Sequence, residues 1–451
     1  MGDVYGRKRF FMAGLAVFTV ASALSGLSTT TSQLIAARAL QGVGAALLVP
    51  GTLSIISATF AGKDRGAAIG IWGAIAGLAI AIGPVVGGYL VEHVSWQSVF
   101  FINVPIGIVG LLLTAVVVPE SKDESKSRRV DPPGLVTGIA AVLFLTYALI
   151  EGNARGWTDG LILGSFGLAA AFFVAFLTVE ARRQSAMLPL RLFRNRTFSG
   201  ANVTAAAMFF AMTGTVFFLT LYLQNVRGYS PARAGLRLFP FSVTILLVAP
   251  FAGKASDRSG SRGLMTAGAV LVALGLAMLL GADAGTSYGA VLLPSFLVMG
   301  SGWALALAPM TNAVMGSVEP RMAGIASAVT NTSREIGATM GVAAIGALVT
   351  SVFTRAFLAR LVEAGMPAGE AARIVGRVGS EAAAGSAGGS APPEVTGAVQ
   401  GAFIHAIHMG IWAAIVAMAV AAVVSFMTVR SHVEPHADHA TEERLRGEAH
   451  A

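Results

Sequence analysis

The stretch from residue 66 to residue 91 reads GAAIGIWGAIAGLAIAIGPVVGGYLV and contains no charged side chain. A helix needs roughly 20 mostly apolar residues to cross the hydrocarbon core of a bilayer, so this stretch is long enough to span a membrane. Its apolar residues are continuous rather than alternating, and lipid admits only helices and closed barrels as spanning structures. The stretch therefore predicts a transmembrane helix.

The same pattern recurs along the whole chain of 451 residues, of which 55% are hydrophobic and only 12% are Asp, Glu, Lys or Arg. This charged share is about half the ~25% of soluble domains. The sequence thus predicts an all-α membrane protein with about twelve transmembrane helices. We expect these spans at residues 10–28, 33–60, 66–91, 97–119, 134–151, 160–180, 198–224, 235–252, 263–282, 286–312, 322–353 and 403–429.

The formal net charge of +8 comes from basic residues in short connectors, with no contiguous basic face. Nucleic-acid binding is therefore not expected. The connectors of one parity carry most of the Lys and Arg, which by the positive-inside rule places both termini in the cytoplasm. We expect a multi-pass protein of the cell (inner) membrane. The chain has no Cys, which excludes disulfides and thiol catalysis.

Three segments do not read as membrane spans. Residues 120–133 are charged and end in Asp131-Pro132-Pro133, which is typical of a cytoplasmic linker. Residues 354–402 are rich in Ala, Gly and Ser and predict a flexible external loop, with an amphipathic helix near 356–378. The polar tail is expected to be disordered. The predicted divisions are an N-terminal bundle of four helices (1–119), the linker with two inserted helices (120–190), a C-terminal six-helix bundle (191–430) and the tail (431–451).

An internal repeat is visible in the connectors. The first loop, Gly2-Asp3-Val4-Tyr5-Gly6-Arg7-Lys8-Arg9, is echoed by the segment 253–262, which contains Asp257 and Arg258. Repeated six-helix halves are a transporter architecture with the binding site between the halves. Eight predicted helices separate the two loops, so the spans 134–151 and 160–180 are the natural insertion.

Four motifs in this order resemble the major facilitator superfamily, and most closely its fourteen-helix drug:proton antiporter branch. They are the loop Gly2–Arg9, the segment Arg38–Ala46 (RALQGVGAA), Gly83-Pro84-Val85-Val86-Gly87-Gly88, and Trp96 followed by FFINVPIG at 100–107. The resemblance covers nearly all of the chain and implies the major facilitator fold. It also implies that about twelve of an expected fourteen helices are present and that the family's first two helices lack a counterpart. A start codon placed too late is favoured over a fragment.

Two pairs of residues are candidates for proton coupling. Arg38 and Gln41 lie one helical turn apart, and a charge at membrane depth normally faces a cavity or a partner. The resemblance implies that Arg38 acts in proton coupling, and the alternative is a structural hydrogen-bonding arginine. Arg334 and Glu335 are the only adjacent charged pair within a predicted span. Glu335 is the best proton carrier present, and the alternative is a pair near a helix end.

Two further sets are candidates for conformational change. The resemblance implies that Gly83, Pro84, Gly87 and Gly88 form a hinge, because proline removes a helical hydrogen bond; ordinary packing is the alternative. In the cytoplasmic loops an Asp can pair with a neighbouring Arg and accept from a helix N-terminus. These gate candidates are Gly2, Asp3, Gly6, Arg7, Asp257 and Arg258, and solvated loop charges are the alternative.

The substrate cavity is predicted more weakly. Its candidates are Asn103, Asn202, Phe209, Phe217 and Asn331, and packing in the core or against lipid is the alternative. His405 and His408 alone are too few for a metal site. No nucleophile elbow, phosphate loop or metal motif stands out. We therefore expect no enzyme, no metal and no cofactor.

These observations predict a secondary active transporter that exports small amphipathic molecules or drugs by proton antiport with alternating access. Its partners would be a small-molecule substrate, protons and the lipid bilayer, and we expect a monomer. Three alternatives remain at this point. They are a narrow-specificity exporter of a natural product or other metabolite, a non-transporting membrane sensor or partner subunit, and a truncated protein that does not transport.

Overall fold

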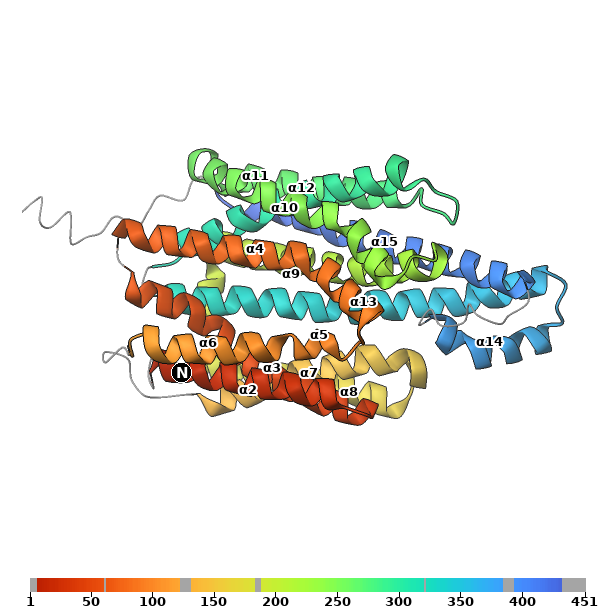
Figure 1. The fold of residues 1–451 in the computed structure, drawn as a ribbon, viewed down its shortest axis with the longest axis horizontal. Coiled ribbons are helices and arrows are strands. Elements are labelled where there is room, and N and C mark those ends of the chain that lie inside the picture. Colours follow the sequence, from red (N-terminus) through yellow and green to blue (C-terminus); the bar gives the residue numbers. More distant parts are fainter. Residues whose placement is uncertain are drawn as a thin grey trace, which may run out of the picture. The chain divides into compact units, whose positions relative to one another are not determined.

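The computed structural model describes residues 6–60, 62–121, 131–182, 188–319, 322–383 and 393–431. Within these ranges the regular elements are helices and no strand is present (Figure 1), which confirms the all-α prediction. The helices are α2 (Arg7–Leu27), α3 (Thr31–Thr59), α4 (Gly62–His93), α5 (Ser98–Phe101), α6 (Asn103–Val117), α7 (Pro132–Arg155), α8 (Gly160–Arg182), η1 (Leu190–Arg194), α9 (Arg196–Leu221), η2 (Tyr222–Val226), α10 (Pro231–Ser259), α11 (Ser261–Leu279), η3 (Tyr288–Leu292), α12 (Leu293–Gly316), α13 (Ala323–Glu363), α14 (Ala368–Ala383) and α15 (Pro393–Thr428).

The beginnings of several helices follow directly from local sequence. Before α3, the Thr30 hydroxyl accepts from the Gln33 amide, and the Gln33 side chain accepts from the Thr30 amide, both at 3.3 Å. This reciprocal capping box satisfies two of the amide groups that a helix start leaves free. The helices α7, α10 and α15 begin at Pro132, Pro231 and Pro393. Proline suits the first turn because its fixed φ is helical and its missing N–H would have no partner there.

The chain divides into two compact units, and unit 1 comprises residues 1–135 and 222–246. In this unit α2 packs along α3 and also contacts α5 and α6. The first half of α10 belongs to the same unit, although it follows α9 of the other unit in sequence.

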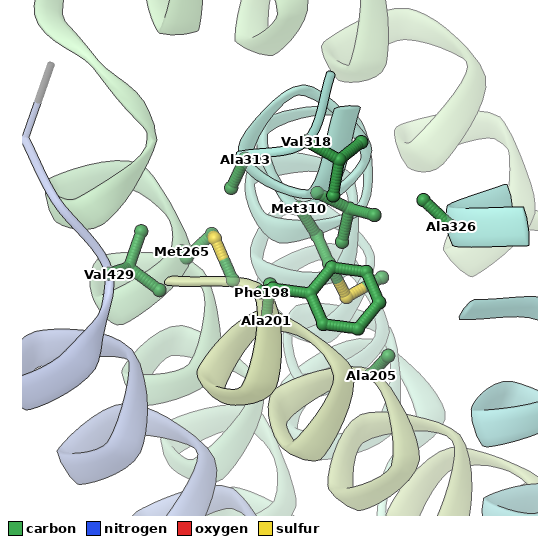
Figure 2. Packing of buried hydrophobic residues seen from close by; sticks show 10 residues of the cluster. Phe198, Ala201, Ala205, Met265, Met310, Ala313, Val318, Ala326 and Val429 are labelled. Atoms are coloured by element: carbon green, nitrogen blue, oxygen red, sulfur yellow. The ribbon is translucent and has the colours of Figure 1, made fainter. Parts of the chain in front are cut away.

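Unit 2 comprises residues 136–221 and 247–451. Here α9 packs against α13 and α15, and α11 packs against α12 and α15. Figure 2 shows part of the core, where Phe198 of α9 lies among Met265, Met310 and Val429. Phe198, Met265 and Met310 are fully buried. The predicted domain boundaries at residues 119 and 190 stay predictions.

Ten helices or helix pairs in the described residues are long and apolar enough to cross a membrane. The chain is therefore a multi-pass membrane protein, but the predicted number of twelve spans is not confirmed. The remaining two predicted spans, 33–60 and 66–91, coincide with α3 and α4, which are continuous helices of 29 and 32 residues. The predicted span 97–119 is interrupted at Ile102, between α5 and α6.

The prediction of a flexible loop over residues 354–402 is wrong for the residues that the structure describes. The helix α13 continues to Glu363 and is 41 residues long, α14 follows, and α15 begins at Pro393. The predicted amphipathic helix exists, but it is α14 at 368–383 and not 356–378. The Ala-rich composition that suggested a loop is also favourable for a helix, and this explains the error.

The ends of α13 and α15 have a core of their own, on which α14 packs (Figure 1). Phe353 stacks on Phe357 with ring centroids 5.6 Å apart, and Phe403 of α15 meets Phe353 edge-on at 6.3 Å. Ala371 of α14 and Leu361 are buried as well. This set of helix ends is therefore a packed structure. The disorder predicted for the tail falls on residues 432–451, outside the described ranges.

Candidate functional site

A chain of polar side chains connects α3 to α2 in unit 1. The Arg38 guanidinium donates to the Gln41 side-chain oxygen, and the Gln41 amide nitrogen donates to the Ser22 hydroxyl. Gln41 is only 3% exposed and Ser22 is fully buried. The Arg38 guanidinium also lies 5.7 Å from the centre of the Phe100 ring. The structure thus brings the predicted pair together and adds Ser22, so that Gln41 is held at both ends of its amide.

The predicted hinge lies in α4, where it packs against the start of α10 within unit 1. A Cβ atom on Gly88 would lie 2.3 Å from the Pro231 carbonyl oxygen, and one on Gly235 would lie 2.1 Å from the Pro84 carbonyl oxygen. Only glycine allows the two backbones to approach so closely. Gly83 and Gly87 would meet nothing within 4 Å. Close packing therefore explains Gly88, and the hinge role of the motif stays a prediction.

A carboxylate caps the start of α10 beside this contact. The Ala232 amide donates to Glu92 Oε2 at 2.9 Å, and Ser230 gives the same carboxylate a side-chain hydrogen bond. These hydrogen bonds, first that of Ser230 and then that of Ala232, lower the pKa of the exposed Glu92 carboxyl. A negative charge at a helix N-terminus is favourable. Sequence reasoning missed Glu92, although it lies one helical turn after Gly88.

The first predicted gate loop is only partly described, because Gly2 and Asp3 lie outside the described residues. Gly6 precedes α2 with a φ of 114°, and the Arg7 amide donates to the Ser121 carbonyl oxygen at 2.9 Å. The next two amides of α2 donate to the carboxylate of Glu120 at 3.1 and 3.3 Å. An acid at the helix start was predicted, but the acid observed there is Glu120.

The second gate loop lies at the end of α10 in unit 2. Asp257 accepts from the Asn312 side chain of α12 at 3.1 Å. No ion pair within the described residues joins Asp257 to Arg258. The observed partner of Asp257 is therefore an amide on another helix and not the adjacent arginine. Whether either loop works as a gate stays a prediction.

Arg334 of α13 contacts side chains of α9 and α12. One terminal nitrogen donates to the Thr311 hydroxyl at 3.1 Å, and the guanidinium carbon lies 5.7 Å from the centre of the Phe209 ring. The Arg334 Nε atom is buried and has no hydrogen-bond partner in the described ranges. Phe209 in turn packs against Trp303, with ring centroids 5.0 Å apart and planes 59° apart. Trp303 is 4% exposed, so the aromatic pair is anchored in α12.

Arg334 and Glu335, the adjacent charged residues of the predicted span, have different surroundings. Glu335 is exposed, and no ion pair in the described part of the chain joins the two residues. Adjacent positions of a helix point about 100° apart, so Arg334 reaches Thr311 while Glu335 points elsewhere. Glu335 makes no side-chain hydrogen bond to a described residue. Its role as a proton carrier stays a prediction.

The five predicted cavity residues are divided between the two units. Asn103 is partly buried at the start of α6 in unit 1, and the others belong to unit 2. Asn202 is buried and donates to the Phe198 carbonyl oxygen at 2.8 Å, while its own oxygen has no partner among the residues that the structure describes. Phe217 is 48% exposed and contacts Phe218.

Of the cavity candidates, Phe209 contacts Arg334, and Asn331 precedes Arg334 by three residues on α13. Both are partly buried. The structure therefore places these two beside Arg334, with Thr311 and Trp303 added. Neither of the added residues carries a sequence signal, because each comes from another helix.

Two glycines that follow Arg334 along α13 allow this helix to pack closely against α9. A Cβ on Gly337 would lie 2.2 Å from the Ala206 carbonyl oxygen, and one on Gly341 would lie 2.1 Å from the Phe210 carbonyl oxygen. These two glycines therefore serve close helix packing, which fixes the distance between α9 and α13.

The described residues contain no group of three or more His, Cys, Asp or Glu that could hold a metal ion. His408, one turn from His405, hydrogen-bonds the Ala282 carbonyl oxygen at 3.0 Å. This contact ties α15 to the segment after α11 and gives His408 a structural role.

A sequence model of the family described as Major Facilitator Superfamily matches residues 1–342. Among similar proteins, the multidrug resistance protein Stp of Mycobacterium tuberculosis is 38% identical over 368 residues, which are 81% of this chain and 68% of that protein. The tetracenomycin C resistance and export protein of Streptomyces glaucescens is 33% identical, with the same coverage of both chains. The methylenomycin A resistance protein of Bacillus subtilis is 36% identical over 77% of this chain and 75% of its own.

Solved structures with the same fold include a bacterial homologue of the human lysosomal transporter Spinster in an inward-facing, unoccupied conformation. It has a TM-score of 0.61 and 16% identity, and the match covers 95% of this chain and 85% of that one. A POT family transporter in complex with 5-aminolevulinic acid has a TM-score of 0.57 and 14% identity, with 94% and 83% covered. These matches confirm the predicted transporter fold, and the family match agrees with the prediction that the chain is not an enzyme.

Proposed function

This chain belongs to the Major Facilitator Superfamily, and we propose that it is a secondary active transporter that exports small amphipathic molecules in exchange for protons. The observation that carries the proposal is the extended similarity to proteins named for multidrug resistance and antibiotic export. The order of the sequence motifs supports a place in the fourteen-helix branch. The distribution of Lys and Arg supports a cell (inner) membrane location with both termini in the cytoplasm.

The mechanism that we propose is alternating access. The hydrogen-bonded chain Arg38–Gln41–Ser22 supports proton coupling, because a guanidinium keeps its charge and orients neighbouring acceptors or water. Glu335 is the titratable group that we assign as proton carrier on this chain. Entry of a proton neutralises the acid and favours the state that reloads substrate. One charge crossing 100 mV releases about 2.3 kcal/mol, so one or two protons can drive a useful substrate gradient.

The test uses the full chain in inverted membrane vesicles, with amphipathic dyes of positive, neutral and negative charge. We expect dye movement into the vesicles when a proton gradient is imposed, and a loss of this movement when an ionophore collapses the gradient. Vesicles without the protein are the control. Dye movement that is unaffected by the ionophore would exclude proton antiport.

A second candidate is a narrow-specificity exporter of one natural product. It is favoured by the relatives named for tetracenomycin C and methylenomycin A. Competition among the dyes and a panel of aromatic and aliphatic antibiotics distinguishes the two candidates. Inhibition by many unrelated compounds supports a broad exporter, whereas inhibition by one structural class supports the narrow one.

A further inference from the structure

We propose that Arg334, Phe209, Trp303 and Thr311 form a binding site for planar aromatic compounds that carry an anionic oxygen. This inference rests on the transport function proposed above and names the class of substrate that the site would take. It moves Arg334 from proton coupling, where its position beside Glu335 had placed it, to substrate recognition.

The first argument is the charge of Arg334. A guanidinium remains protonated in proteins and offers five N–H donors in a planar fork. Among the described residues, Arg334 gives one hydrogen bond, to Thr311, and its buried Nε has no partner. No ion pair joins it to a carboxylate within the described ranges. A charge in a membrane-spanning helix is unfavourable unless it is paired, so a guanidinium without a described carboxylate partner favours an anionic ligand.

The second argument is the aromatic surface next to that charge. The guanidinium carbon lies 5.7 Å from the centre of the Phe209 ring, and the ring centroids of Phe209 and the buried Trp303 are 5.0 Å apart. Guanidinium and aromatic planes both stack on flat ring systems. Phe209 is only partly buried, so part of its ring is free to contact a ligand. A flat ligand can thus stack on the rings while its anionic oxygen meets the guanidinium.

The third argument is access and rigidity. Thr311 is exposed, and Asn331, one turn from Arg334, makes no side-chain hydrogen bond to a described residue. Both can therefore reach a ligand that approaches Arg334. Gly337 and Gly341 lock α13 against α9, which keeps Arg334 and Phe209 at a constant separation. A site whose parts cannot move apart loses less entropy on binding.

The experiment measures equilibrium binding of three probes to the purified full chain in detergent. The probes are 9-anthracenecarboxylate, 9-anthracenecarboxamide and 9-(aminomethyl)anthracene, which share one ring system and differ in charge. We expect the carboxylate to bind most tightly. Arg334→Gln should weaken carboxylate binding by at least about tenfold and leave the amide within about twofold, while Phe209→Leu should weaken all three probes. Arg334→Lys keeps the charge but loses the planar fork, so its affinity for the carboxylate should lie between those of the unchanged protein and Arg334→Gln.

Arg355→Gln is the matched control. It removes an exposed arginine of the same helix, whose Nε donates to the Ser351 carbonyl oxygen, and it should change no affinity. The proposal would be overturned if Arg334→Gln weakened the binding of all three probes equally, or if it left the affinity for the carboxylate unchanged. Because binding needs no proton gradient, selective binding without gradient-driven efflux would contradict only the transport function. Gradient-driven efflux without carboxylate selectivity would contradict only this site.

Discussion

Arg38 in unit 1 and Arg334 in unit 2 both lie in apolar helices, but their surroundings differ. Arg38 begins a chain of hydrogen bonds that ends at the buried Ser22 hydroxyl. In the described part of the chain, Arg334 has one hydrogen-bond partner, Thr311, and a buried nitrogen without any. Buried polar networks stabilise a fold when every group is satisfied and are costly when one is not. The same residue type thus starts a hydrogen-bonded chain that reaches a buried hydroxyl in one region, and keeps a buried donor without a described partner in the other.

The largest effect that we expect tests whether the α9–α13 contact supports the Arg334 region. Gly341→Val places a side chain against the Phe210 backbone, where even a Cβ would come within 2.1 Å of the carbonyl oxygen. Overpacking of this kind should lower the free energy of unfolding by about 3 kcal/mol, measured by thermal unfolding in detergent. Gly346→Val is the control, because a Cβ there would meet the Phe218 ring at an ordinary 3.7 Å. Equal stability of the two variants would contradict the role of this contact.

The second prediction breaks the network of Arg38. Gln41→Leu keeps the volume of the buried side chain but leaves Arg38 and Ser22 without their shared partner. We expect a loss of about 2 kcal/mol in the free energy of unfolding. Adding Ser22→Ala to this variant should lower the free energy of unfolding only slightly further, since the Ser22 hydroxyl has already lost its donor. Additive losses in the double variant would mean that the two side chains are not coupled.

The third prediction applies the matching change to the other arginine. Thr311→Val removes the hydrogen bond that the structure shows for the Arg334 side chain and keeps the shape of the Thr311 side chain. Because Thr311 is exposed, we expect a loss below about 1 kcal/mol in the same unfolding assay. A loss larger than that of Gln41→Leu would reverse the comparison between the two regions.

The smallest expected effect concerns Glu92, a carboxylate outside both regions that caps α10. Its pKa is lowered in the folded protein by Ser230 and Ala232. The stability that this contact contributes is therefore full above the usual glutamate range and is lost as pH falls through the lowered pKa. The difference in Tm between the protein and Glu92→Gln should be positive near neutral pH and vanish in acid. A difference that is constant over pH would show that the charge of Glu92 does not stabilise the contact.

Sequence patterns predicted the helical membrane fold well, because runs of apolar residues report directly on the surrounding lipid. They also placed Arg38 one turn from Gln41, where the structure joins them. Contacts between distant segments could not be predicted: Ser22 and Thr311 come from other helices than their arginines. The adjacency of Arg334 and Glu335 in sequence did not predict a contact between their side chains, since neighbours on a helix point in different directions.

The length of α13 has a consequence for the faces of the membrane. Its 41 residues extend about 60 Å, twice the ~30 Å hydrocarbon thickness. Together with α14 and the start of α15, its end would therefore stand in water on one side only. An antibody against α14 can therefore test on which side of the membrane this projection lies. Staining of intact cells would show that the projection faces outward. Staining only after permeabilisation would show that it faces the cytoplasm.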